Sequence, residues 1–285
     1  MERFMMFDLG TVPRYRLVRS PLVQALGQVH FPVRAKIPTL EGVASIQERL
    51  YSFFPYMREQ RGQQVSLLVG PTGAASTQSQ SAHTWQFSDD SGWSLSLSAD
   101  TATLSAGSQY GEFTEFSDRF RAVLTALAED AGVTRADRIG IRYINVADVL
   151  LGNAEPWHSW FRPELTGWVT TDIVSEATHL VTSITQSHLS AQELINPNGS
   201  EILNVQGLVR HGLIPANTMV PGVLPIQPPG PAFLLDIDLF IEAPQLFDAE
   251  DLSRQITVLH DQIDRFFFWT ISPQGARHFG LEVLP

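Results

Sequence analysis

The segment "RIGIRYIN", residues 138–145, limits the possible folds of this chain more than any other feature. It alternates with a period of two, and successive side chains of a β-strand point to opposite faces of a sheet. As a strand it places Arg138 and Arg142 on one face, while the other face carries two isoleucines, a tyrosine and Asn145. Two cations on one sheet face need an anionic ligand, a carboxylate elsewhere in the chain, or water.

A second alternating segment, "LLDIDLFIE" at 234–242, carries the complementary charges. Asp236, Asp238 and Glu242 share one face, and the other face is apolar. An acidic row of this kind faces solvent, pairs with a basic row, or holds a divalent cation through its oxygens. We expect arginine–carboxylate pairs between the two segments, and an anionic ligand if those pairs are absent. The candidate ligand-binding residues are Arg138, Arg142, Asn145, Asp236 and Asp238.

Three apolar stripes with helical spacing predict helices that can cover the apolar faces. The first helix begins near Thr39 and ends by Pro55, and the second spans about 113–127. The third begins near Asp248, which is a candidate N-cap with two acidic residues in the following turn. Strands with helices packed on one face predict an α+β protein with largely antiparallel sheets.

The order of these elements predicts two α+β halves. The first, residues 15–150, reads β-α-β-β-β-α-β, with a small, polar hairpin loop at 70–82. The second, residues 151–285, begins with a junction rich in proline, glycine and tryptophan at 151–168. It also contains a proline-rich loop at 215–231, whose six prolines exclude a helix or a central strand.

Composition excludes several classes of protein. The formal net charge of −11 argues against general nucleic-acid binding, and it suits a basic partner or serves only solubility. Without cysteine there is no disulfide framework, thiolate zinc site or cysteine nucleophile. No apolar run approaches the ~18 residues that cross a bilayer, and no signal peptide is visible. We therefore expect a cytoplasmic protein that does not bind membranes.

Enzyme signatures are absent from the sequence, including dinucleotide-binding, P-loop, zinc-protease and serine-hydrolase motifs. His260 and Asp264 are spaced i, i+4 on the last predicted helix, but no candidate nucleophile lies nearby in the sequence. We interpret them as a structural or surface pair. The chain reads as a non-enzyme more readily than as an enzyme, and no cofactor or metal is predicted.

Aromatic residues in the junction suggest how a non-enzyme could act. Tryptophan and arginine are the usual anchors of protein interfaces, but these aromatic side chains could equally seal a junction inside the chain. The leading hypothesis is an interaction protein that neutralises or recruits a protein partner encoded nearby. The alternatives are a small-molecule or nucleotide site, with or without metal-dependent catalysis, between the halves, and a subunit of an oligomer. The candidate partner-binding residues are Trp157, Trp160, Phe161 and Trp168.

Several short motifs occur in a fixed order along nearly the whole chain: "PLVQALGQVHF", "TWQF" with "GWSLSLSADTATL", "YGEFTEF", "RIGIRYIN", "LLDIDLF" and "LHDQIDRFFFWTIS". In this the chain resembles a sporadically distributed, uncharacterised prokaryotic family of about this length. The most recognisable parts of that family are the RIGIRYIN-type strand and the C-terminal LH…F…IS helix. The resemblance implies the two-part α+β layout, and it supplies no activity that could be carried over to this chain. Gln24 and Gln28 stand where the family tends to have glutamates, so no role of those carboxylates carries over.

Overall fold

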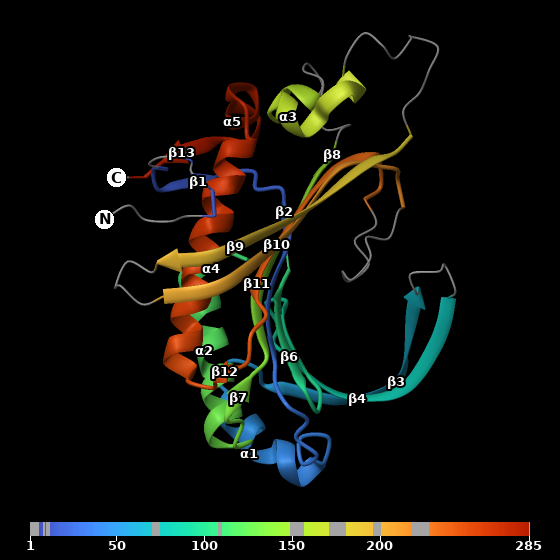
Figure 1. The fold of residues 1–285 in the computed structure, drawn as a ribbon, viewed down its shortest axis with the longest axis vertical. Helices are drawn as coiled ribbons and strands as arrows, with labels where there is room; N and C mark the ends of the chain where they lie inside the picture. The colour runs from blue at the N-terminus through green and yellow to red at the C-terminus, as the bar shows by residue number, and fades with distance from the viewer. Residues whose placement is uncertain are drawn as a thin grey trace. The chain divides into compact units, whose positions relative to one another are not determined.

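The computed structural model describes residues 6–7, 9, 12–69, 75–107, 110–148, 157–170, 181–195, 201–217 and 228–284. Helices accompany one nine-stranded sheet and two two-stranded sheets, which confirms the α+β class (Figure 1). The order in the large sheet is β3 (Tyr56–Val69), β4 (Ala75–Ser88), β5 (Trp93–Leu97), β6 (Thr101–Ala106), β2 (Leu22–His30), β8 (Arg138–Asp148), β11 (Ala232–Ile241), β10 (Glu201–Ile214) and β9 (Ser183–Ile195).

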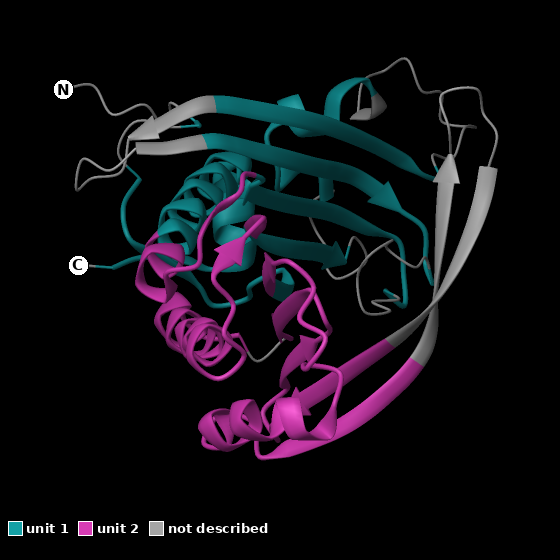
Figure 2. Cartoon of the chain, turned by 60° about the horizontal axis from the view of Figure 1, so that its bottom comes forward, with its two compact units in different colours: residues 1–25, 140–242, 255–285 teal, residues 26–139, 243–254 magenta. Residues whose placement is uncertain are grey.

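The chain divides into two compact units, shown in Figure 2. Unit 1 comprises residues 1–25, 140–242 and 255–285, and unit 2 comprises residues 26–139 and 243–254. This division differs from the halves expected at 15–150 and 151–285, because most of β8 belongs to the same unit as β9, β10 and β11. The sequence placed β8 at the end of the first half by chain order alone.

Unit 2 is built on the antiparallel strands β3 to β6 with helices α1 (Leu40–Leu50) and α2 (Phe113–Glu129). The hydroxyl of Thr39 caps α1 by accepting the Gly42 N–H at 3.0 Å, as expected for an N-cap threonine. The apolar stripe of α2 is buried, and its Phe116 ring lies so close to β2 that a Cβ on Gly27 would approach it to 2.8 Å. Only glycine permits this close packing. The short strands β7 (Arg135–Ala136) and β12 (Gln245–Leu246) also pair in this unit.

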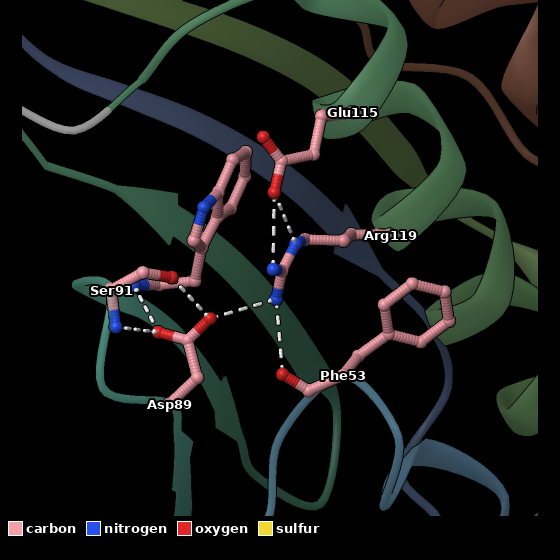
Figure 3. A network of polar contacts seen from close by, with 6 residues as sticks. Phe53, Asp89, Ser91, Glu115 and Arg119 are labelled. Atoms are coloured by element: carbon pink, nitrogen blue, oxygen red, sulfur yellow. Dashed lines mark hydrogen bonds and ion pairs between the residues drawn. The ribbon is translucent and has the colours of Figure 1, made fainter.

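Arg119 of α2 ties together three segments of unit 2 (Figure 3). Its guanidinium pairs with Asp89 and Glu115, both at 3.1 Å, and donates to the Phe53 carbonyl at 3.0 Å. It also lies 4.6 Å from the ring centroid of Trp93, within the range of a cation–π contact. Burial raises the pKa of Asp89, but hydroxyl and backbone donors together with Arg119 outweigh it and lower that pKa. The cluster thus holds α2 against the sheet.

The expectation of a hairpin loop at 70–82 is wrong for most of these residues. Strand β4 begins at Ala75 and pairs with β3 from Val69 to Tyr56, so the two strands form a long antiparallel hairpin. The segment is rich in serine and glutamine and has no apolar alternation. Composition therefore indicated a loop where strand pairing decides the structure. Residues 70–74 lie outside the described part of the chain.

Unit 1 contains β8 to β11 and most of the long helix at the C-terminal end of the chain. This helix, α4, begins as predicted, because Asp248 Oδ1 accepts the Asp251 N–H at 2.8 Å. Helix α4 lies beside the sheet (Figure 1), and its apolar stripe, which includes Ile256, Leu259 and Ile263, is buried. The remaining elements of unit 1 are β1 (Tyr15–Leu17), η1 (Trp157–Ser159), α3 (Pro163–Thr166), η2 (Gly167–Thr170), α5 (Pro273–Phe279) and β13 (Leu281–Val283), and α4 itself spans Ala249–Thr270.

Two sequence expectations fall partly on undescribed residues. Of the proline-rich loop at 215–231, the described ends, 215–217 and 228–231, are neither helix nor strand. Residues 218–227 lie outside the described part, as do 151–156 at the start of the junction. Among the helices that the structure describes, none is both long enough and apolar enough to cross a membrane.

Candidate interaction site on the sheet of unit 1

Arg142, Asp236 and Arg210 form an ion-pair cluster on three neighbouring strands of unit 1. Arg142 donates from Nε and Nη2 to the two carboxylate oxygens of Asp236, at 2.7 and 2.8 Å. Arg210 lies directly opposite Asp236 in the β10–β11 register, and its Nη2 is 2.6 Å from Oδ2. The Asp236 side chain is only 1% exposed. A buried carboxylate thus receives one bidentate and one single charge-assisted contact.

The cluster confirms the pairing expected from alternation for Arg142 and Asp236. Two positive charges meet one negative charge, so the three residues together carry one excess positive charge. The Nε of Arg210 is buried and has no hydrogen-bond partner among the described residues. Arg142 and Asp236 therefore form an ion pair with each other within the chain. Their role in ligand binding stays a prediction.

The other predicted ligand residues have separate surroundings. Arg138, which belongs to unit 2, donates to Gln28 Oε1 at 2.9 Å. The buried Asn145 lies on the other face of β8 and donates to the Leu235 carbonyl at 3.2 Å. Asp238 is half-buried on the same face as Asp236. Among the described residues, no group of three or more histidine, aspartate or glutamate side chains could hold a metal ion.

The predicted aromatic surface is wrong for two of its four residues. Trp160 is 1% exposed and Phe161 3% exposed, and the Trp160 ring stacks on His278 with centroids 3.7 Å apart. Trp157 is half-buried, and only Trp168, 62% exposed, is a surface residue. Trp160 and Phe161 thus seal the interior of unit 1, which is the structural alternative that the sequence left open.

Strand β9 forms an edge of the sheet in unit 1. Strand β9 pairs with β10 on one side and ends the nine-stranded sheet, and no described residue forms a strand on its other side. All side chains from Ile184 to His188 are exposed, so both faces of the strand are open there. Val181, just before the strand, is 64% exposed, and Ile184 is 54% exposed.

The composition of β9 makes this edge unusual. Natural proteins protect exposed edge strands with lysine, proline or other charged side chains. At the opposite end of the sheet, β3 carries the exposed charges Arg58, Glu59 and Arg61. Strand β9 contains no lysine, arginine or proline over its 13 residues, and Glu193 is its single charged residue. The β9 edge therefore lacks the usual protection against pairing with another strand.

The ion-pair cluster continues toward this edge. Gln186 of β9 lies opposite Arg210, and it interacts with His188 two residues further along the same face at 2.9 Å. Arg142, Asp236, Arg210 and the polar Gln186 thus lie on four neighbouring strands, from β8 to the edge strand, and the ion pairs join the first three of these residues. The ion pairs join β8, β11 and β10, the strands behind β9, to one another.

On the other face of β8, Tyr143 contacts the half-buried His260 of α4. The Tyr143 hydroxyl is 2.8 Å from His260 Nδ1, and burial lowers the pKa of His260 to about 4. One turn later, Asp264 accepts the Tyr15 hydroxyl at 2.8 Å, and burial raises the pKa of both groups. His260 and Asp264, which are spaced i, i+4 on α4, therefore each form a hydrogen-bonded contact with a tyrosine inside unit 1.

Sequence reasoning missed Arg210 and the β9 edge. Arg210 stands in an alternating segment, and its parity with Gln206, opposite Val205 and Val209, could have placed it on the polar face. The edge position of β9 had no local signal, because strand order depends on the whole fold. Comparison with protein-family models and with curated proteins finds no match to this chain.

Proposed function

We propose that this protein is a non-enzymatic interaction protein, which binds an extended segment of a protein partner at the β9 edge. The observation that carries the proposal is an edge strand exposed on both faces and without lysine, arginine or proline. Strand addition to such an edge obtains its affinity from main-chain hydrogen bonds and its specificity from alternate side chains. Strand β9 is already extended and paired with β10, so the edge needs little ordering on binding.

The charge of the chain favours a basic partner. Two copies of a protein with net charge −11 repel each other at long range, whereas a basic segment is attracted. The exposed side chains of β9 are mainly serine, threonine and glutamine, with Ile184 as an apolar contact. The proposed occupant is therefore an extended, basic segment of a different protein, and pairing of two copies through β9 is the competing outcome.

Site-specific photocrosslinking tests the proposal. The photoreactive amino acid p-benzoylphenylalanine is placed at Thr185 or Gln186, which point to opposite faces of β9, and at the exposed Gln60 of β3 as a control. The protein is crosslinked in its own host, and the joined peptides are identified by mass spectrometry. We expect one partner segment to be joined at both β9 positions and not at Gln60. Crosslinks to a second copy, equal crosslinking from Gln60, or none at β9 would contradict the proposal.

Proline substitutions at successive β9 positions provide the matched control. Backbone N–H groups of an edge strand alternate between its partner strand and the outside. One of Thr185→Pro and Gln186→Pro therefore removes a bond to β10, while the other removes only an outward N–H. The variant that keeps the unfolding midpoint of the parent should lose binding to the crosslinked partner segment. Full binding by that variant would exclude strand addition there.

A further inference from the structure

Unit 1 contains a hollow of about 320 Å³ where α4 ends and α5 begins. Its walls are mainly apolar and half-buried, and none of the described residues that line it is an aspartate or glutamate. The volume is at the lower end of the range for small-molecule sites. The residues that the argument uses are Arg162, Phe268, Trp269, Ile271, Ala276 and Leu281.

Arg162 brings a positive charge to this apolar hollow. Its backbone N–H donates to the Thr270 carbonyl at 2.9 Å, and its Nε donates to the Trp269 carbonyl. The guanidinium carbon lies 5.2 Å from the Trp269 ring centroid. These contacts fix the side chain but engage neither terminal nitrogen, and no carboxylate among the described residues pairs with Arg162. Two N–H-bearing nitrogens of a fixed cation thus remain available.

A second hollow, in unit 2, shows what is distinctive here. It is also lined by arginines, but Arg49 pairs with Glu129 and Asp130, and Arg121 pairs with Asp118. The cations of that hollow are therefore neutralised within the chain. Within the described part of the chain, no carboxylate neutralises Arg162 in the unit 1 hollow, and most of the residues that line that hollow are apolar.

We propose that the unit 1 hollow binds a small apolar carboxylate. The carboxylate is held by the two terminal nitrogens of Arg162, because a guanidinium group can form a bidentate hydrogen-bonded contact with a carboxylate. The hydrocarbon part lies against Phe268, Trp269, Ile271 and Leu281. The volume has room for about ten water-sized groups, so it suits a medium-chain acid. This inference does not depend on strand addition at β9.

Titration calorimetry of the full chain with octanoate tests the charge and the size of the ligand together. Octanoate should bind saturably with one site per chain. Octan-1-ol, which has the same chain without the charge, should bind at least about tenfold more weakly, because it forms no charge-assisted hydrogen bond. Octylammonium should not bind. Equal binding of octanoate and octan-1-ol, or no saturable heat from octanoate at millimolar concentration, would overturn the proposal.

Substitutions locate the site and separate charge from shape. Arg162→Gln should weaken octanoate binding about ten- to a hundredfold and leave octan-1-ol unchanged, while Arg162→Lys should restore much of the loss. Ala276→Leu should fill the hollow and abolish binding of both ligands. Arg121→Gln, which changes the net charge equally in the other hollow, is the control.

Thermal unfolding and near-ultraviolet circular dichroism establish that each variant is folded. If Arg162→Gln were unstable, the comparison of Ala276→Leu with the parent chain would still decide the location. Unchanged octanoate binding in a folded Arg162→Gln or Ala276→Leu variant would contradict the assignment.

Discussion

Arg142 and Asp236 join β8 to β11 by two parallel hydrogen bonds of 2.7 and 2.8 Å between a guanidinium and a buried carboxylate. The pair fixes more than two side chains. A one-residue slip between these strands would move Asp236 to the apolar face that α4 covers, where it would have no cation. The pair therefore specifies the register of the central strands of unit 1.

Replacing the shared carboxylate should strongly destabilise the protein. Asp236→Asn keeps the shape but leaves Arg142 and Arg210 without their anion in a mostly buried place. Loss of one partner from a buried ion pair costs about 3–5 kcal/mol of unfolding free energy. Urea unfolding measures the change, with the exposed Asp251→Asn as control, for which about 0–1 kcal/mol is expected. A cost below about 1 kcal/mol for Asp236→Asn would show that the pair does not stabilise the sheet.

His260 should make stability depend on pH. In the folded chain the pKa of His260 is about 4, and in an unfolded chain a histidine titrates near 6.5. Between these values the unfolded chain binds a proton that the folded chain does not, so this group lowers stability as pH falls from 6.5 to 4. The full effect is about 3 kcal/mol.

His260→Gln keeps an acceptor for the Tyr143 hydroxyl and removes the titration. Urea unfolding from pH 7.5 to 4 should therefore show a smaller loss of stability in the variant than in the parent chain. Parallel curves over this interval would mean that His260 does not titrate as its burial requires.

The Tyr15 hydroxyl should be more important at neutral pH than in acid. Burial raises the pKa of Asp264, and the hydrogen bond from Tyr15 opposes that rise. A carboxyl group whose pKa is raised in the folded chain makes the protein less stable as pH increases through its titration range. Tyr15→Phe removes the hydrogen bond that opposes the rise, so the folded-state pKa of Asp264 should increase further and this loss of stability should be larger. The variant should lose about 1–3 kcal/mol at pH 7 and less at pH 4.

Urea unfolding at the two pH values measures this difference. Tyr56→Phe is the matched control, because Tyr56 donates to Asp90 at 3.0 Å on an exposed surface. An equal cost of Tyr15→Phe at both pH values would exclude coupling to Asp264.

The junction tryptophans should separate into one structural and one surface residue. Trp160→Ala removes a fully buried ring that stacks on His278, and the expected cost is about 3–5 kcal/mol. Trp168 is 62% exposed, and Trp168→Ala should change stability by about 0.5 kcal/mol or less. Thermal unfolding of the two variants compares them directly, and a similar loss in both would contradict the burial difference.

Local patterns predicted much of this fold. Alternation in "RIGIRYIN" and "LLDIDLFIE" gave two strands and the correct polar face of each, including the Arg142–Asp236 pair. The apolar stripes and the Asp248 cap located α2 and the start of α4. These features depend on neighbouring residues, which the sequence displays directly.

The features that the sequence did not predict depend on contacts distant in the chain. The sequence left open whether Trp160 anchors an interface or seals the interior, because the residues that bury it, such as His278, lie far along the chain. The second cation of Asp236, Arg210, depends on the β10–β11 register. The edge position of β9 depends on the order of all nine strands.

Hydrogen exchange along β9 tests the central claim most directly. Amide exchange is measured at single-residue resolution in the free protein and in its complex with the crosslinked partner segment. Strand addition predicts that alternate β9 amides, those pointing away from β10, exchange fast in the free protein and become protected in the complex. Unchanged β9 amides, with protection on another surface, would contradict it.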